Sequence, residues 1–383
     1  MIRVNALERQ NAPLLPEFFR VLNESVSTSS FILRDEVKKL EERVRYLLGE
    51  DSHVIGVNSG TDALMLSIFA AGIRAGDEVL VPSRTYIASV SAIVHARAKP
   101  VFIDVGEDLN LDVDCVVPLI TSETKAIMPV HLSGHPCEMQ KIMQIARDFN
   151  LVVIEDAAPA IGSKFRGQSV GSFGDFAAIS LHPLKVLGVL GDGGLLVVNN
   201  HELANYLSVY RDHGHPQPKA FENFNSFGVN SRLDNIQAGF ANIKIPLLDN
   251  WINQRRKNAL RYLEVLVKTR VGRQFDKQLE SLRPGSDFYD SYSSFVISVE
   301  NRGDFIDSMA SDPFPVEVLT SFPRPLHNHP NLLKFYNISL PQKLPRTEYF
   351  SERTVQIPVH ADLTDREVEI ICEKLSKYFR RKN

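Results

Sequence analysis

The chain has 383 residues, of which 44% are hydrophobic and 23% are charged, and its formal net charge is -3. This composition is typical of a globular protein that is long enough for two domains with a sizeable core. The small negative charge excludes a general attraction for nucleic acid, and no apolar run approaches the roughly 20 residues of a membrane span. We therefore expect a cytoplasmic protein with neither nucleic acid nor membrane as partner.

The three cysteines show no Cys-x-x-Cys spacing, which argues against both a disulfide framework and a zinc site. No metal is therefore expected.

From about residue 35, helical patterns alternate with short β-branched runs, which is typical of a mostly parallel sheet with helices on both faces. The expected strands are Val54–Val57, Glu78–Val81, Pro100–Asp104, Ala126–Val130, Leu151–Glu155, Phe176–Ser180 and Leu195–Val198. The expected helices between them are Thr61–Ala71, Ile87–His95, Met139–Phe149 and Glu202–Asp212. The pattern predicts an α/β fold with a large, doubly wound domain over residues 1–245.

The sequence pattern changes towards the end of the large domain. A charged amphipathic stretch, Leu233–Lys268, leads into a region in which prolines recur from Pro313 to Pro345. A strand-like segment, Ser294–Val299, and a final helix, Asp365–Arg381, predict a smaller C-terminal α+β domain over residues 246–383.

The first chemical motif is a strand that runs into a helix through Asn58-Ser59-Gly60-Thr61. Such a helix start exposes backbone N–H groups at the positive end of the helix dipole, and the two hydroxyls add donors, so the motif can hold a phosphate. An ordinary N-cap has the same residue preference. Taken alone, the motif leaves both interpretations open.

The second motif places Glu155-Asp156 at the carboxyl end of an apolar strand, where open α/β sheets bind their ligands. Asp156 is followed by two alanines, so it can approach a flat ring closely. For an isolated aspartate, a helix cap or an ion pair with an arginine is the alternative. We expect Glu155 to face away from the ligand and to serve the structure.

The third motif is Lys185, which has apolar neighbours and precedes a glycine-rich loop that contains Gly188, Gly191, Gly193 and Gly194. Apolar walls favour a neutral amine, and an amine of this kind can form an imine. A lysine amine and a carboxylate that keeps a pyridinium nitrogen protonated are what pyridoxal 5′-phosphate requires of a protein. A nicotinamide dehydrogenase is disfavoured because the Gly-x-Gly-x-x-Gly fingerprint is absent from the first strand-to-helix turn.

Several blocks in the right order resemble the DegT/StrS-type sugar aminotransferases, a fold type I family that depends on pyridoxal phosphate. The similarity spans nearly the whole chain. Its blocks are Phe31-Ile32-Leu33, Asn58 to Leu64, Gly76 to Val79, Thr85 to Ala88, Pro129 to Leu132, Glu155 to Ala158, the Lys185 loop to Gly194, Gly228 to Leu233, and Ile357 to His360.

The resemblance implies roles for individual residues. Lys185 would form the imine with the cofactor, Asp156 would pair with its pyridine nitrogen, and Tyr86 would stack on its ring. The phosphate would be held by Ser59, Gly60, Thr61 and Ser180, with Asn230 reaching it from the second subunit of a homodimer. Some family members carry histidine at the lysine position and dehydrate sugars, so the lysine here favours amino transfer.

One position departs from the family pattern. The family commonly has glutamine after Glu-Asp-Ala-Ala, whereas this chain has Pro159, which lacks both the amide group and a backbone donor. The hydrogen bond that the glutamine makes near the cofactor is therefore not expected. His131, His182 and His327 fall in family-like segments, and no role is assigned to them.

The resemblance implies a transaminase that takes an amino group from L-glutamate and gives it to a keto sugar. The acceptor is expected to be a nucleotide-linked 3-keto or 4-keto deoxysugar, within deoxyamino sugar synthesis such as that for lipopolysaccharide. One alternative is a keto or aldehyde sugar without a nucleotide, such as an ulosonic acid or a cyclitol. Another is a regulatory protein that binds the cofactor without catalysis.

Overall fold

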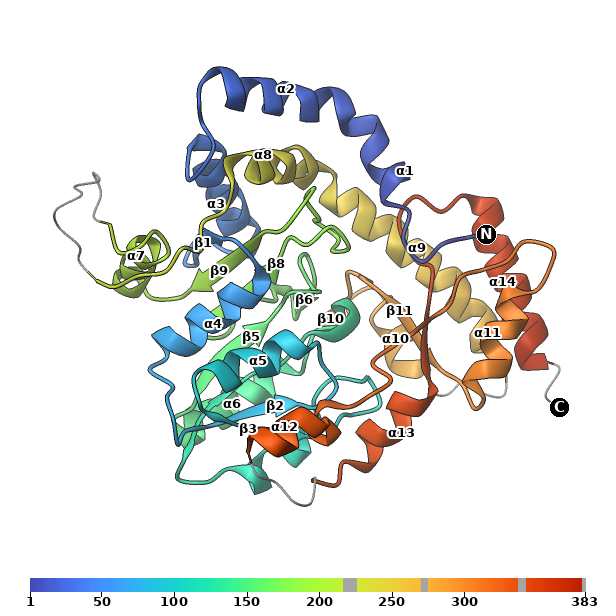
Figure 1. Ribbon diagram of the computed structural model, residues 1–383. Coiled ribbons are helices and arrows are strands. Elements are labelled where there is room, and N and C mark those ends of the chain that lie inside the picture. The colour runs from blue at the N-terminus through green and yellow to red at the C-terminus, as the bar shows by residue number, and fades with distance from the viewer. Residues whose placement is uncertain (216–225, 270–274, 337–341, 381–383) are drawn as a thin grey trace.

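The computed structural model describes residues 1–215, 226–269, 275–336 and 342–380. A seven-stranded sheet forms the centre of the larger part of the molecule (Figure 1), and its strand order is β1-β9-β8-β5-β4-β2-β3. The strands are β1 (His53–Val57), β2 (Glu78–Pro82), β3 (Lys99–Ile103), β4 (Thr124–Ile127), β5 (Val152–Asp156), β8 (Phe176–Ser180) and β9 (Gly194–Val198). β9 runs opposite to both neighbours, and the remaining pairs are parallel. All seven predicted strands are confirmed, with ends that differ by at most three residues.

Helices cover both faces of this sheet. One face is packed by α4 (Gly60–Ala70), α5 (Ile87–His95) and α7 (His201–Tyr210). The other face is packed by α3 (Asp35–Leu48), α6 (Met139–Phe149) and α8 (Asn235–Lys244). The strands β2, β8 and β9 are buried along their whole length, so their residues do not alternate between apolar and polar as in a sheet with one exposed face. The doubly wound α/β fold is confirmed.

The C-terminal part contains a three-stranded antiparallel sheet of β12 (Leu319–Thr320), β13 (Thr354–Ile357) and β11 (Phe295–Ser298). It packs with α9 (Leu248–Leu266), α11 (Arg302–Ala310) and α14 (Asp365–Arg380) around a second apolar cluster. The predicted strand near residue 295 and the final helix are confirmed, although Arg381 lies outside the described residues.

The other elements include a small sheet in which β6 (Lys164–Phe165) pairs with β7 (Gln168–Ser169) and β10 (Phe288–Tyr289). The remaining α-helices are α1 (Leu7–Asn11), α2 (Leu15–Ser27), α10 (Asp276–Glu280), α12 (Pro330–Phe335) and α13 (Pro345–Arg353). The amphipathic stretch that begins near Leu233 is divided, because Pro246 lies in a 3₁₀ turn between α8 and α9.

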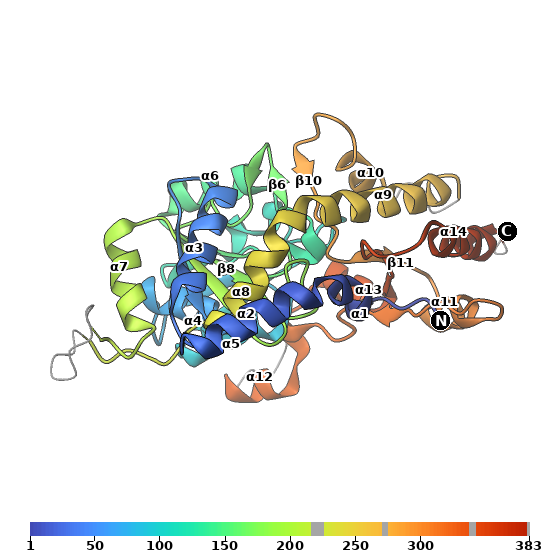
Figure 2. The same ribbon diagram turned by 90° about the horizontal axis from the view of Figure 1, so that it is seen from above.

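Each of the two parts contains residues that pack into the core of the other. Near the N-terminus, the Ile2 N–H donates to Pro315 O at 2.7 Å, and the Ile2 side chain belongs to the C-terminal cluster. Both ribbon views place this end of the chain beside the C-terminal helices (Figures 1 and 2). Conversely, Leu326 and Leu344 pack into the core of the large sheet. The division at residue 245 stays a prediction.

No helix in the described parts of the chain is both long and apolar enough to cross a membrane.

Candidate active site

A cavity of about 400 Å³ lies at the carboxyl ends of the parallel strands. Its wall includes the start of α4, the start of α5, the end of β5, the end of β8 and the loop that follows β8. The predicted site residues that line it are Ser59, Gly60, Thr61, Tyr86, Asp156, Ser180 and Lys185. Asn230 is the one predicted site residue that does not line the cavity within this chain.

Asp156 is the last residue of β5, and it is 3% exposed. Its Oδ2 accepts a hydrogen bond of 2.6 Å from the Ser89 hydroxyl on α5, and its Oδ1 accepts one of 3.2 Å from the Ala158 N–H. Each oxygen therefore retains a lone pair. A buried carboxylate that is fixed in this way and faces a cavity can hold the proton of a cationic ring nitrogen.

Lys185 lies in the loop between β8 and β9, where its backbone N–H donates to His182 O at 2.8 Å. Its Nζ has no hydrogen-bond or ion-pair partner among the residues that the structure describes. Burial lowers the pKa of the Lys185 amine, and the negative charge of Asp156 opposes this shift. The lowered pKa increases the fraction of the amine that is neutral, which is the form that reacts with an aldehyde.

The start of α4 forms another side of the cavity. Ser59 is the N-cap, and its Oγ accepts a hydrogen bond of 3.1 Å from the Asp62 N–H. The N–H groups of Gly60 and Thr61 belong to the first turn and have no acceptor within the helix. The motif is therefore an ordinary N-cap that also presents donors to an anion, so the two interpretations are compatible.

Gly60 allows this helix start to approach β8 closely. A Cβ atom at Gly60 would lie 2.9 Å from the Ser180 Cβ, which is closer than real Cβ contacts. Ser180 ends β8, and its Oγ accepts a hydrogen bond from the His182 N–H at 3.3 Å. The close packing brings two hydroxyls and two free N–H groups to one side of the cavity.

Tyr86 and Asn230 lie on exposed surfaces. Tyr86 is 67% exposed just before α5, although it lines the cavity. Asn230 is exposed, and its Oδ1 accepts a hydrogen bond from Arg232 Nε at 3.0 Å. Ile87 and Val229, which adjoin these two residues in the sequence, are also exposed, as are Leu184 and Leu190 in the Lys185 loop.

Glu155 and two of the unassigned histidines serve the structure. Glu155 is fully buried and accepts hydrogen bonds from the backbone N–H groups of Gly171, Phe173 and Gly174, and it also contacts His131 Nε2 at 3.0 Å. His327 is buried between Ser83 and Glu348. His182 is exposed and lines the cavity.

Sequence reasoning missed two residues near the cofactor pocket. Ser89 lies 67 positions before the carboxylate that it contacts, and no local signal points to it. Phe322 lines the cavity from the C-terminal part of the chain, and its only signal is its place in the proline-rich region. Pro159 also lines the cavity, where its ring offers no hydrogen-bond donor.

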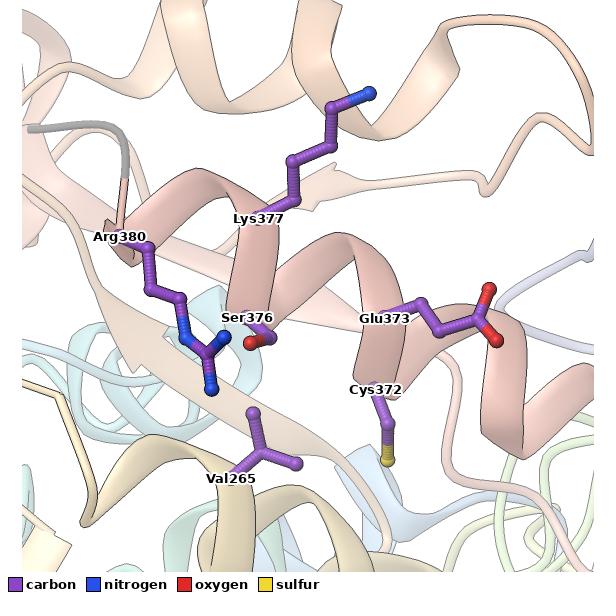
Figure 3. A pocket seen from close by; sticks show the side chains of 6 residues that line it. All are labelled: Val265, Cys372, Glu373, Ser376, Lys377 and Arg380. Atoms are coloured by element: carbon purple, nitrogen blue, oxygen red, sulfur yellow. The ribbon is translucent and has the colours of Figure 1, made fainter.

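A second hollow, of about 640 Å³, lies between α9 and α14. Figure 3 shows that the Lys377 and Glu373 side chains extend away from Val265, so their charges do not converge. Burial raises the pKa of the Cys372 thiol to about 11, which leaves it protonated and unreactive. No group of three potential metal ligands occurs in the described ranges. The groups that can carry out a reaction therefore lie in the Lys185 cavity.

A reactive amine, a buried carboxylate and a helix N-terminus around one cavity fit pyridoxal 5′-phosphate, because they match its aldehyde, its ring nitrogen and its phosphate. Together with the seven-stranded sheet, these groups define a pyridoxal-phosphate enzyme of fold type I.

The chain belongs to the DegT/DnrJ/EryC1/StrS aminotransferase family, whose model matches residues 15–376. It is 36% identical to the dTDP-3-amino-3,6-dideoxy-alpha-D-galactopyranose transaminase of Aneurinibacillus thermoaerophilus, over 99% of both chains. It is 35% identical to the UDP-N-acetyl-3-dehydro-alpha-D-glucosamine 3-aminotransferase of Acidithiobacillus ferrooxidans, over 94% of this chain and 93% of that one. A relative from Geobacillus stearothermophilus, named a pleiotropic regulatory protein, is 36% identical over 98% of this chain and 97% of its own.

Solved structures agree with this assignment. DesV of Streptomyces venezuelae, solved with a ketimine intermediate, superposes with a TM-score of 0.88 at 32% identity and full coverage of both chains. NtdA of Bacillus subtilis, solved with its cofactor PMP, superposes with a TM-score of 0.85 at 27% identity over 99% of this chain and 86% of that one. The protein is a sugar aminotransferase that uses pyridoxal phosphate.

Proposed function

We propose that this enzyme transfers an amino group from L-glutamate to a nucleotide-linked 3-keto or 4-keto deoxysugar. The observation that supports the chemistry is the convergence of Lys185, Asp156 and the start of α4 on one cavity. The relatives named for dTDP-3-amino and UDP-3-dehydro sugars support a nucleotide-linked acceptor that is aminated at C3.

Lys185 is the proposed catalytic residue. Its Nζ would hold the cofactor covalently through the aldehyde, with loss of one water molecule, until the amino donor takes its place. The freed Nζ would then act as the general base that accepts the proton from Cα of the donor and would return it to the cofactor carbon on the other side of the imine nitrogen. The bound cofactor supplies an electron-withdrawing ring that stabilises the charge left on Cα.

The other residues hold and orient the cofactor in this proposal. The Asp156 carboxylate keeps the ring nitrogen protonated, and Ser89 fixes the orientation of that carboxylate. The phosphate binds at Ser59, Gly60, Thr61 and Ser180 through hydroxyl and backbone N–H donors. The Tyr86 ring stacks on the cofactor from the exposed side.

A homodimer completes the site. Tyr86, Ile87, Leu184 and Leu190 leave apolar surface exposed beside the cavity, which a second copy would cover. Asn230 is exposed and outside the cavity of its own chain, which is consistent with a contact to the cofactor phosphate of the partner.

Replacing the proposed nucleophile tests the chemistry. Lys185→Ala should abolish the absorbance of the covalently bound cofactor and remove turnover, because no other lysine lines the cavity within the described residues. Lys164→Ala, at an exposed position on β6, is the matched control and should behave like the natural protein. Turnover of Lys185→Ala at the natural rate would overturn the assignment.

A product assay tests the substrate. Mass spectrometry after incubation with L-glutamate and a panel of dTDP-, UDP- and GDP-linked 3-keto and 4-keto sugars should show the mass change that corresponds to replacement of the carbonyl oxygen by a hydrogen and an amino group. Amination of only nucleotide-free ulosonic acids or cyclitols would favour that alternative. If no amino acid converts the cofactor to its amine form, the regulatory alternative gains support. The cytoplasmic location and the link to lipopolysaccharide stay predictions.

A further inference from the structure

Arg84 is a fully buried arginine beside the active site, and none of the roles assigned above includes it. Its side chain is 1% exposed, and it directly precedes Thr85 and Tyr86, which both line the cavity. It forms no ion pair with a carboxylate in the part of the chain that the structure describes. Burial lowers the pKa of this guanidinium to about 9.

The contacts of Arg84 reach across to the C-terminal part of the molecule. Its Nη2 donates hydrogen bonds of 3.0 Å to both Ser321 Oγ and Thr354 Oγ1. Its Cζ lies 5.3 Å from the centre of the Phe322 ring, over the face of that ring. Nε and Nη1 have no acceptor among the described residues. The guanidinium is thus oriented by two hydroxyls and one aromatic ring.

Phe322 is the place where the C-terminal part reaches the cavity. Among the described residues that line the cavity, every other one lies between residues 59 and 193. Its φ of +47° is in the left-handed region, which is unfavourable for a residue with a Cβ atom. Surrounding contacts must therefore hold this residue in place, and the stacked guanidinium is one of them.

A buried guanidinium that has no carboxylate partner does little to stabilise the fold. Removing such a charge from water is costly, and replacing buried charges by apolar residues of similar volume is often neutral or stabilising. Strained or costly groups of this kind collect at functional sites. The energetics therefore favour a role for Arg84 in shaping the cavity.

We propose that Arg84 is a positioning residue that holds the Phe322 ring in the wall of the cofactor cavity, and that the pair sets the fit of the acceptor sugar. This inference rests on the proposed function. The nucleotide sugar is much larger than glutamate and fills more of the cavity, so displacement of one wall affects the sugar more.

The test compares Arg84→Met, Phe322→Ala and the double variant. The two half-reactions are followed by cofactor absorbance, one with L-glutamate and the other with the amino sugar nucleotide produced most rapidly in the panel assay. Arg84→Met should keep an unfolding temperature close to that of the natural protein and weaken the sugar half-reaction about tenfold, with a smaller loss for glutamate. If Arg84 acts through Phe322, the double variant should be no worse than Phe322→Ala alone.

Arg255→Met is the matched control. Arg255 is also buried, but it donates to the backbone carbonyl oxygen of Tyr292 and does not line the cavity. This variant should lower the unfolding temperature without a selective loss toward the sugar. A crystal structure of Arg84→Met should show the Phe322 ring displaced.

Three outcomes would overturn the inference: natural sugar kinetics in Arg84→Met, additive losses in the double variant, or loss of folding with equal loss of both half-reactions. If instead the natural enzyme performs neither half-reaction, the proposed function itself fails.

Discussion

Lys185 combines a charge-bearing side chain with an environment that disfavours the charge. Because its pKa is lowered by burial, the folded protein binds fewer protons than the unfolded chain at pH values between the lowered pKa and the ordinary lysine value of 10.5. The stability of the cofactor-free protein should therefore rise with pH across this window, and the contribution of this amine should be constant below the window, where both states are protonated.

The same shift predicts how cofactor binding depends on pH. Only the neutral amine attacks an aldehyde, so the rate of pyridoxal phosphate incorporation into the cofactor-free enzyme should rise with pH and level off below pH 10.5. Stopped-flow absorbance measures this rate. A rate that still climbs tenfold per pH unit up to 10.5 would contradict a lowered pKa.

Glu155 and Asp156 are adjacent carboxylates whose surroundings differ, and this difference gives the first a structural role and the second a proposed role in ligand binding. Glu155 accepts hydrogen bonds from three backbone N–H groups and also contacts a histidine, which leaves little capacity for a ligand. Asp156 accepts only two hydrogen bonds and faces the cavity. Alternation along a strand indicates that the two side chains point to opposite faces, and the packing of each face decides their tasks.

At the scale of elements, α4 and β8 are closely packed at the cofactor site. A Cβ atom at Gly60 would be 3.2 Å from the Ser180 Cα and 2.9 Å from its Cβ, and neither atom can move without shifting β8. A Cβ at Gly194 would lie 2.2 Å from the Ser59 carbonyl carbon on the opposite side. The helix start is therefore held between two strands.

Gly60→Ala should separate the helix N-terminus from Ser180 and weaken cofactor binding by roughly 1–3 kcal/mol, the usual cost of overpacking. Equilibrium titration of the cofactor-free protein measures this affinity. Gly303→Ala, in α11, is the matched control, because its Cβ meets nothing closer than 3.5 Å and alanine favours a helix. Unchanged affinity in Gly60→Ala would show that this contact does not position the phosphate site.

At the scale of the whole molecule, the proposed dimer makes each active site depend on two chains. Lys185→Ala and Asn230→Ala chains should each be impaired as homodimers. After unfolding and refolding together, hybrid dimers should contain one intact site, which restores about one quarter of the natural number of sites. Turnover of the mixture, compared with each variant alone, measures this recovery.

No recovery above the two separate variants would mean that Asn230 acts within its own chain or has no role. A sedimentation experiment on the same samples provides the control, because it shows whether the chains associate and exchange.

Residues that are far apart in the sequence also join the two parts of one molecule. Arg9 forms a two-point ion pair with Glu367 on α14, with N–O distances of 2.8 and 2.9 Å, and thereby ties the N-terminus to the final helix. The hydrogen bonds from Arg9 lower the pKa of Glu367 to about 2. These contacts join residues more than 350 positions apart, so no local pattern could have predicted them.

The sequence by itself determined the elements and the chemistry. Short β-branched runs predicted all seven strands of the large sheet, and Lys185, Asp156 and Ser59-Gly60-Thr61 were recognisable because each motif lies at or just after the end of a strand. Only the tertiary structure decided which groups meet: Ser89 with Asp156, Gly60 with Ser180, and Arg84 with Phe322. The physical reason is that periodicity reports which residues are buried locally, whereas contacts between distant segments depend on how the buried faces pack against one another.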